Sequence, residues 1–156
     1  MVSVIDPTAV KISIADAGED ASDPLATGYT ELLGIGSFEI DPGKKDVEMI
    51  VGFASSDSNR FHLVKKPAGL VTVTLSDALL DMATVKNLFY DSSNTPASRT
   101  TENVALAIVL TQQDSTVVDH NFDNAYLVDF KISGSKDNAV MADLTFVCKP
   151  TDYTVS

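Results

Sequence analysis

Alternation of apolar and polar residues with a period of two is the feature that most constrains how this chain can fold. In the stretch VDFKISGSKDNAVMADLTF, residues 128 to 146, such alternation runs on both sides of a polar turn. The apolar positions on the two sides of the turn are Val128, Phe130, Ile132, Val140, Ala142, Leu144 and Phe146. A strand turns successive side chains to opposite faces of a sheet. The stretch therefore predicts two antiparallel strands with one apolar face and one mostly polar face.

Further strand patterns recur along the chain. They cover residues 10–16, 29–40, 47–53 and 70–75. Gly34 and Gly36, inside the second of these stretches, predict a bulge or a sharp bend. The continuous apolar run in residues 102–113 predicts a central strand that is covered on both faces. Residues 114–125 are expected to return the chain to the hairpin.

Two segments depart from the strand pattern. In residues 76–91 the apolar residues fall at helical spacing, with Ser76 or Asp77 as the N-terminal cap, which predicts a single long helix. Residues 54–69 are partly polar without clear periodicity, and they predict a long loop. Several strands with one helix indicate a mainly β fold, an antiparallel β-sandwich or barrel with one flanking α-helix at about residues 76–91. At 156 residues, we expect one β domain spanning residues 1–156.

The charge balance is strongly acidic, with 22 Asp and Glu against 11 Lys and Arg and a net charge of −11. Such a surface repels nucleic acid and anionic membranes at contact range. It fits an ordinary soluble protein, and it also fits a surface that lets a polyanion pass without binding it. The N-terminal residues lack the charged region and apolar core of a signal peptide, and no run approaches the length of a membrane span.

Residues that could carry chemistry are few. Cys148 is the only cysteine, so it has no partner for an internal disulfide, and its apolar neighbours predict a buried, inert thiol. His62 and His120 stand alone, without a second ligand at metal-binding spacing. The letters SGSK, from Ser133 to Lys136, match a hydrolase motif but lie in the predicted hairpin turn. We therefore expect no enzyme, no cofactor and no resident metal.

One stretch has the spacing of a calcium loop. Asp119, Asn121 and Asp123 occupy the first three ligand positions, but Asn124 replaces the required glycine and Phe130 replaces the closing glutamate. This excludes an EF-hand and leaves open an incidental calcium ion at the surface. The acidic loop that contains Asp16, Glu19, Asp20 and Asp23 could also hold a cation, or it could simply be solvated.

With no evident pocket chemistry, the remaining interpretation is a surface that binds other chains. Phe53, Phe61, Leu63 and Val64 lie in or next to the long loop of residues 54–69 and are candidate inter-subunit contacts. The alternative is that they pack onto the chain's own core. An open sheet edge would be a second contact element, because its unpaired N–H and C=O groups can accept a strand from another chain.

Three stretches resemble the tail tube (major tail) proteins of long-tailed bacteriophages. YTELLGIGSFEIDPGKKDVEM is similar to their early strand and charged turn, and GLVTVTLSDALLDMATVKNLFY to their strand leading into a single helix. LVDFKISGSKDNAVMADLTFVCKP is similar to their closing hairpin, and the three stretches occur in the same order. The resemblance implies a β-sandwich or barrel with one flanking helix, a fold shared with the tube protein of type VI secretion.

The resemblance also implies an assembly. Hexameric rings would join their inner sheets into one β-barrel channel and would stack into a tube, with the long loop and terminal arms contacting neighbours. DNA would pass through without sequence-specific binding. The expected partners are further copies of the chain and other tail proteins, namely a tape measure protein, a terminator and, around a contractile tail, a sheath. The expected location is the virion tail, assembled in the cytoplasm of a host bacterium, with no membrane partner.

An acidic channel wall would keep the DNA polyanion from sticking, because each lumen-facing carboxylate becomes a ring of charge in the assembly. Asp129 and Asp143 are the acids on the polar side of the predicted hairpin, so they are the candidate channel-lining residues, and Lys131 shares the parity of Asp129. The net charge of −11 should keep free subunits apart, so salt should promote assembly by screening.

Two other classes of protein remain open. The chain could be another virion component, such as a capsid decoration protein or a neck or terminator ring protein. It could also be a soluble β-sandwich binding module for a ligand such as carbohydrate. The absence of tryptophan and an aromatic content of only 7% disfavour the latter, because sugar-binding surfaces use aromatic platforms.

Overall fold

The computed structural model describes residues 5–32, 34–43, 47–51, 61–65, 69–79 and 103–156. The described residues form strands and one short 3-10 helix, Pro150–Asp152. The strands are β1 (Ile5–Asp16), β2 (Thr30–Glu31), β3 (Ser37–Asp41), β4 (Val47–Val51), β5 (Phe61–Lys65), β6 (Val71–Leu79), β7 (Val104–Gln112), β8 (Val117–Ser135), β9 (Asn138–Cys148) and β10 (Tyr153–Val155).

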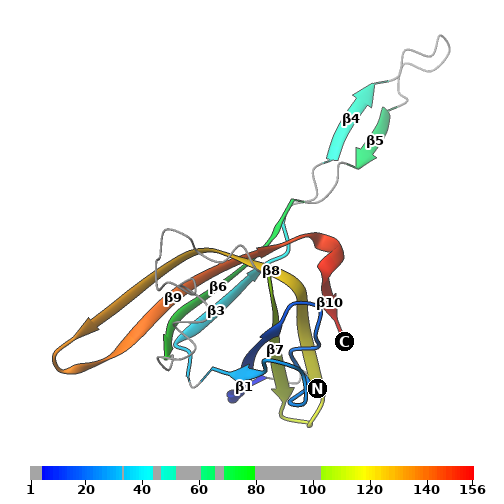
Figure 1. Ribbon diagram of the computed structural model, residues 1–156. Helices are drawn as coiled ribbons and strands as arrows, with labels where there is room; N and C mark the ends of the chain where they lie inside the picture. Colours follow the sequence, from blue (N-terminus) through cyan, green and yellow to red (C-terminus); the bar gives the residue numbers. More distant parts are fainter. Residues whose placement is uncertain (1–4, 33, 44–46, 52–60, 66–68, 80–102) are drawn as a thin grey trace.

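An eight-stranded antiparallel sheet folds back on itself at its longest strand, β8 (Figure 1). The first half of β8 pairs with β7 and with β10, and the second half pairs with β9. One layer therefore contains β2, β1, β7, the first half of β8 and β10; we call it the β1 layer. The other contains the second half of β8, β9, β6 and β3; we call it the β9 layer. The sheet path ends at β2 and β3 without closing, so the described strands form a sandwich, as predicted, and not a closed barrel within one chain.

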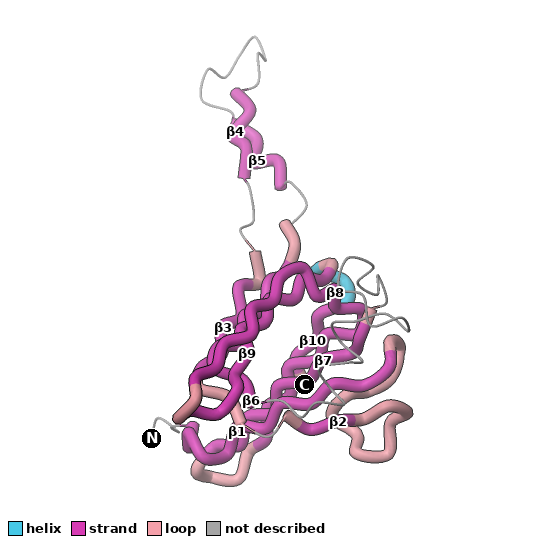
Figure 2. Tube along the Cα trace, turned by 60° about the vertical axis from the view of Figure 1, so that its left-hand side comes forward, coloured by secondary structure: helices cyan, strands magenta, loops and turns pink. Residues whose placement is uncertain are grey.

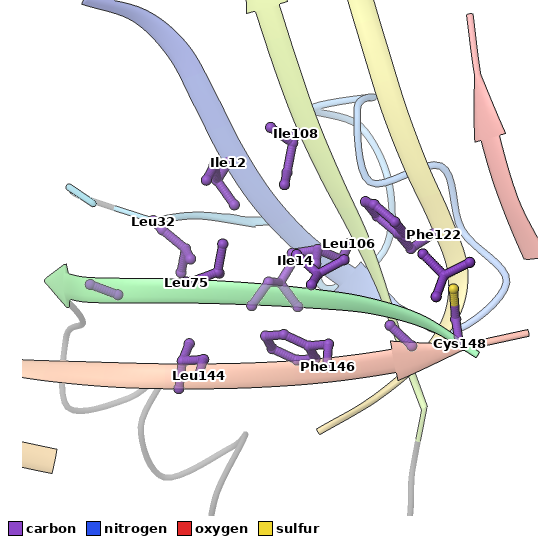
Figure 3. Close-up of a cluster of buried hydrophobic side chains, with 14 of the residues drawn as sticks. Ile12, Ile14, Leu32, Leu75, Leu106, Ile108, Phe122, Leu144, Phe146 and Cys148 are labelled. Carbon is purple, nitrogen blue, oxygen red and sulfur yellow. The ribbon is translucent and has the colours of Figure 1, made fainter. Parts of the chain in front are cut away.

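The core lies between the two layers (Figure 3). Alternate residues of β6 and β9, such as Leu75, Leu144 and Phe146, are fully buried and face the apolar side chains of β1, β7 and β8. Ala105 to Ile108 of β7 are buried in succession, which confirms the prediction of a central strand covered on both faces.

Small residues on the far face of the β1 layer let a loop pack closely over it. Ala15, Ala105 and Ala107 form a second buried cluster with Ala21 of the loop between β1 and β2. The buried Ser13 hydroxyl donates a hydrogen bond to the Ala21 carbonyl oxygen. The loop is therefore fixed to the sheet, although it carries three acids.

The two glycines predicted to mark a bend do so. Gly34 bridges to Leu79, and the Gly36 amide donates to the Ser76 carbonyl at 3.0 Å, where β6 has a register shift and Asp77 adopts a φ of 55°. A Cβ atom on Gly36 would lie 2.8 Å from the Cβ of Asp77, which is closer than van der Waals contact allows. Glycine is needed here because β3 starts against the bulge of β6.

The predicted helix of residues 76–91 is wrong at its start. Ser76–Leu79 continue β6, because the bulge at Asp77 lets the strand resume its pairing with β9 at Ala78. Residues 80–91 lie outside the described part of the chain. The polar pair Ser76–Asp77 suits a helix cap and a strand bulge equally well, and the pairing with β9 decides between them.

The structure also corrects two other predictions, for residues 114–125 and 54–69. The segment 114–125, expected only to return the chain, includes the first half of β8 from Val117 onward. The expected loop of residues 54–69 contains β5, which pairs with β4 in a separate hairpin. This hairpin stands away from the two layers (Figures 1 and 2).

Candidate assembly surfaces

The β9 layer turns one face to the core and the other face away from it. Residues directly opposite each other on paired strands share a face, so the register identifies the outward residues. One row across the layer runs Glu39, Thr74, Thr145 and Asp129. We call this surface the polar face; its other polar members are Ser37, Asp41, Thr72, Lys131, Ser133 and Asp143.

The polar face contains both channel-lining candidates. Asp129 lies opposite Thr145, and Asp143 lies opposite Lys131, and both carboxylates belong to exposed residues. With Glu39 and Asp41 from β3, the face carries four acids against one lysine. It is thus an acidic, threonine-rich surface on the side of the sheet away from the core.

Asp143 also has a structural contact. Its Oδ1 atom accepts a hydrogen bond of 3.0 Å from the backbone N–H of Asp77, at the bulge of β6. This bond satisfies an N–H group that the bulge withdraws from the ladder. Asp143 therefore holds the bulge and at the same time presents its second carboxylate oxygen on the polar face.

The β9 layer has two strand edges that pair with no other described strand. β3 pairs only with β6, and the second half of β8, from Tyr126 onward, pairs only with β9. Three antiparallel pairings separate these strands, so β3 and β8 run in opposite directions. A copy placed beside the first could therefore continue the layer with an antiparallel pairing of β3 and β8.

Apolar side chains near the outer edge of the second half of β8 are more exposed than the sequence pattern predicts. Val128 is the extra residue at a register shift in β8 and is 50% exposed. Ile132 and Val140, on the core-facing side of the β8–β9 hairpin, are 38% and 59% exposed. The predicted apolar face is therefore buried only from Ala142 to Phe146.

The predicted loop contacts fall in or near the β4–β5 hairpin. The register places Phe61 opposite Val51, Leu63 opposite Met49 and Val64 opposite Glu48. Phe53 lies outside the described residues. The hairpin thus brings three of the four candidates onto one strand, which the sequence pattern placed in a loop.

The chain ends are paired where the structure describes them. β10 pairs with β8, and Asp119 and Ser156 exchange two backbone hydrogen bonds of 2.9 and 3.0 Å. The C-terminal segment therefore belongs to the chain's own β1 layer. Residues 1–4 lie outside the described part.

Three titratable groups, of which two are partly buried and one is buried, lie on or beside β10. His120 Nδ1 lies 2.8 Å from the Tyr153 hydroxyl oxygen, and burial lowers the pKa of His120 while it raises that of Tyr153. Burial also raises the pKa of the Cys148 thiol to about 11, so this cysteine is the inert, buried thiol that the sequence predicts. These groups contribute to packing between β8, β9 and β10.

The calcium-like spacing of Asp119, Asn121 and Asp123 falls on a strand, which agrees with the exclusion of an EF-hand. All three lie on strand β8, where alternation spreads them along one face instead of curling them around an ion. Among the described residues, no group of three or more His, Cys, Asp or Glu side chains could hold a metal ion. No helix in that part of the chain is long and apolar enough to cross a membrane.

The contribution of β3 and β6 to the polar face was not predicted from the sequence. Glu39 and Asp41 alternate with Phe38 and Ile40, which pack against the core, and this short alternation in SFEID was the available signal. The register of four strands was needed to show that these acids lie on the same surface as Asp129.

Comparison with known proteins gives no family assignment, since no family model and no curated protein matches the chain. Solved structures do match its fold. A chain in the cryo-EM structure of the anti-feeding prophage baseplate matches with a TM-score of 0.61 at 10% identity, over 100% of this chain and 97% of that one. A chain in the structure of the anti-feeding prophage tube-terminating cap matches with a TM-score of 0.58 at 14% identity, over 100% and 93%.

A third match is a chain in an extracellular contractile injection system, in the structure of the PVC sheath/tube terminator, with a TM-score of 0.54 at 10% identity. It covers 93% of this chain and 92% of that one. The protein therefore has the β-sandwich fold of chains found in contractile injection particles.

Proposed function

We propose that this protein is a structural subunit of a tail or injection tube, which polymerises as stacked hexameric rings around a channel. The observation that carries the proposal is the β9 layer, with two antiparallel edge strands that pair with no further described strand, a buried apolar face and an acidic outward face. The fold match to injection-particle chains supports the same class of function. The role is non-enzymatic and needs no cofactor.

In the proposed ring, β3 of one copy pairs with the second half of β8 in the next. Even numbers of strands per copy keep every junction antiparallel, so identical layers can close into one large barrel without leaving an edge. Like charges directly opposite each other destabilise a strand pair. The favoured register therefore sets Glu39 of one copy beside Lys131 of its neighbour, and keeps Glu39 away from Asp129 of that neighbour.

The polar face then lines the bore. Asp129, Asp143 and Glu39 become rings of carboxylates, which dominate the local potential because each is repeated around the axis. Duplex DNA carries about one negative charge per 1.7 Å of axis. An acidic wall keeps the duplex separated by a layer of counterions, so DNA passes without specific binding. The partners are other tail proteins, including a tape measure protein, a terminator and a sheath, in a virion tail assembled in the bacterial cytoplasm.

Cysteine cross-linking tests the ring and its register together. Glu39 and Lys131 lie at opposite edges of the layer, three strand spacings of about 4.8 Å apart across the sheet and two residues apart along it, so cysteines there cannot bond within one chain. In the double variant Glu39→Cys/Lys131→Cys, mild oxidation should give a ladder of disulfide-linked oligomers that ends at the hexamer. Cys148 should not interfere, because it is buried and its pKa is raised.

The single variant Glu39→Cys is the matched control and should give no ladder. A double variant that stays monomeric after oxidation, while electron micrographs show rings, would refute the edge pairing. Absence of both rings and ladder at every protein concentration would refute the proposed function itself.

A second candidate role is a ring that ends a tube, because two of the matched structures are named as a tube-terminating cap and a sheath/tube terminator. Negative-stain images of the purified protein distinguish the two roles. Long hollow filaments support a tube subunit, and single rings that never lengthen support a terminating ring.

A further inference from the structure

The outer edge of β8 has a short regular stretch to which another strand can be added. β8 and β9 pair without interruption over five residues, from Asp129 to Ser133. A register shift bounds this stretch on each side, with Val128 as the extra residue on the side that precedes Asp129. A bulge disrupts the regular order of backbone N–H and C=O groups along a strand. Residues 129–133 are therefore the part of this edge that can extend the sheet regularly.

The other edge strand, β3, has the same length. Its five residues, Ser37–Asp41, pair continuously with β6. Gly36, just before β3, is bonded to the bulge of β6, and beyond the other end the Gly43 N–H donates a bond of 2.9 Å to Asp41 Oδ1. Two stretches of equal length can meet along their full length in a single antiparallel register. In that register Ser37 of one copy lies opposite Ser133 of the next.

The core-facing side chains support this register. It sets Phe38, which packs against the core, opposite Ile132 of the neighbour, and Ile132 is 38% exposed in the single chain. Apolar pairs directly across two strands stabilise a sheet. Only a slip by an even number of residues keeps the apolar side chains on the core side. The slip that sets Asp41 opposite Lys131 places Phe38 opposite Gly134, which has no side chain, so the apolar pair is lost.

The same register brings two acids together on the polar face. It sets Glu39 beside Lys131, which attract each other, but it also sets Asp41 directly opposite Asp129. Residues in that position have Cβ atoms about 5 Å apart, and like charges there destabilise a strand pair. The nearest other charges within each copy are Glu39 beside Asp41, and Lys131 and Asp143 beside Asp129. Because Glu39 engages the one lysine, the acid pair stays unneutralised.

We propose that Asp41 of one copy and Asp129 of the next form a repelling pair at every ring junction, and that this pair limits ring formation. The inference rests on the proposed edge pairing and adds a regulation of that contact. The apolar contact fixes the register, and the repulsion makes the rings form only at a higher concentration of subunits than the apolar contact alone would require. In a closed ring the repulsion recurs at all junctions, whereas two copies that meet experience it once. The pair therefore opposes ring closure more than first contact.

Neutralising either acid tests the pair. Asp129→Asn should lower the critical concentration for ring formation at least about threefold. Asp41→Asn should do the same, and it keeps an oxygen that can accept the bond from the Gly43 N–H. Asp137→Asn, in the exposed turn of the β8–β9 hairpin, removes the same charge away from the junction and is the matched control. It should change the critical concentration much less.

Two double variants separate the pair from the net charge. Asp41→Asn/Asp129→Asn should have little more effect than either single substitution, because one of them already removes the repulsion. In the variant Asp129→Lys the new lysine attracts Asp41, so the addition of Asp41→Asn should now raise the critical concentration. A response to net charge alone would lower it, because the chain as a whole is acidic.

Cross-linking measures the register independently. Asp41→Cys/Asp129→Cys should give a ladder of disulfide-linked oligomers on mild oxidation. Asp41→Cys/Lys131→Cys, which matches the slipped register, should give it much more slowly. Circular dichroism checks that each variant is folded, and sedimentation measures the critical concentration.

Rings in which Asp41→Asn and Asp129→Asn behave like Asp137→Asn would overturn this inference and leave the proposed function intact. A faster ladder in the slipped register would do the same. A wild-type chain that remains monomeric at all concentrations would overturn both.

Discussion

Asp143 has two roles at the scale of a single residue, and they can be separated by substitution. One oxygen closes the bulge of β6 through the Asp77 N–H, and the carboxylate charge adds to the polar face. Asparagine keeps an oxygen acceptor and removes the charge, whereas alanine removes both.

We expect Asp143→Ala to lower the free energy of unfolding by about 1 kcal/mol, the usual contribution of one hydrogen bond, while Asp143→Asn changes it by much less. Urea unfolding followed by circular dichroism measures both. Equal losses in the two variants would mean that the bond to Asp77 contributes nothing. Asp143→Asn should also make the assembled channel less acidic without unfolding the subunit.

His120 should make stability depend on pH in a defined direction. Burial lowers its pKa in the folded state relative to the usual value of about 6.5. The unfolded chain then binds a proton more readily than the folded chain, so the free energy of unfolding falls as the pH is lowered through about 6.5 toward the folded pKa. Above that range the stabilisation is fully present.

The variant His120→Gln should flatten this part of the pH profile, and His62→Gln, on β5, is the matched control. Urea unfolding between about pH 7.5 and pH 5.5 is the measurement, in a window above the usual titration of carboxylates. A wild-type profile that already lacks a slope here would contradict the prediction. The hydrogen bond between His120 and Tyr153 links this titration to the packing of β10 on β8.

At the scale of an element, the β4–β5 hairpin is the part of the described structure that should contribute least to the stability of the two layers. Its strands pair only with each other among the described strands, so it adds little to the stability of the two layers. Its two ends already meet, because a Cβ atom on Gly43 would lie 3.1 Å from the Gly69 carbonyl oxygen.

Replacing residues 44–68 with a Gly-Ser linker should therefore leave the melting temperature of the folded subunit within about 3 °C of the wild type. The same deletion should weaken assembly, because it removes Phe61, Leu63 and Val64, the candidate inter-subunit contacts. Calorimetry and electron microscopy check the two halves of this prediction. Loss of folding would show that the hairpin supports the core, and normal stacks would show that it is dispensable for assembly.

The sequence predicted those elements whose pattern is local. The apolar run of β7 and the alternation in the β8–β9 hairpin were confirmed because burial follows directly from residue type there. It failed at Ser76–Leu79, where polar residues that suit a helix cap instead form a strand bulge held by β9. It also failed at β5 and at the first half of β8, where pairing with a partner strand decides the conformation and the local pattern is weak.

The sequence predicted only part of the polar face, for the same reason. Asp129 and Asp143 were predicted to share a face, because the period of one hairpin is enough to show it. Glu39 and Asp41 join them only through the register of β3, β6 and β9, which is a long-range property that a single sequence does not display.

At the scale of the whole molecule, the net charge of −11 makes subunits repel each other. Assembly should therefore be favoured when salt screens this repulsion. The screening length falls from about 30 Å at 0.01 M to about 8 Å at 0.15 M, so long-range repulsion between subunits is largely removed over this range. We expect the critical concentration for ring and tube formation to fall as salt is raised to about 0.15 M.

Light scattering and sedimentation at a series of NaCl concentrations measure this dependence. Assembly that does not change between about 0.01 and 0.15 M would contradict the role of net charge.

The central claim is that the β9 layers of neighbouring copies join edge to edge and turn their polar faces toward a common channel. A cryo-EM reconstruction of the polymer formed by the purified protein tests this most directly. We predict that β3 of each copy hydrogen-bonds to the second half of β8 in the next, with Glu39, Asp129 and Asp143 lining the bore. Density that places these carboxylates on the outer wall, or that leaves both strand edges unpaired in the assembled particle, would contradict the account.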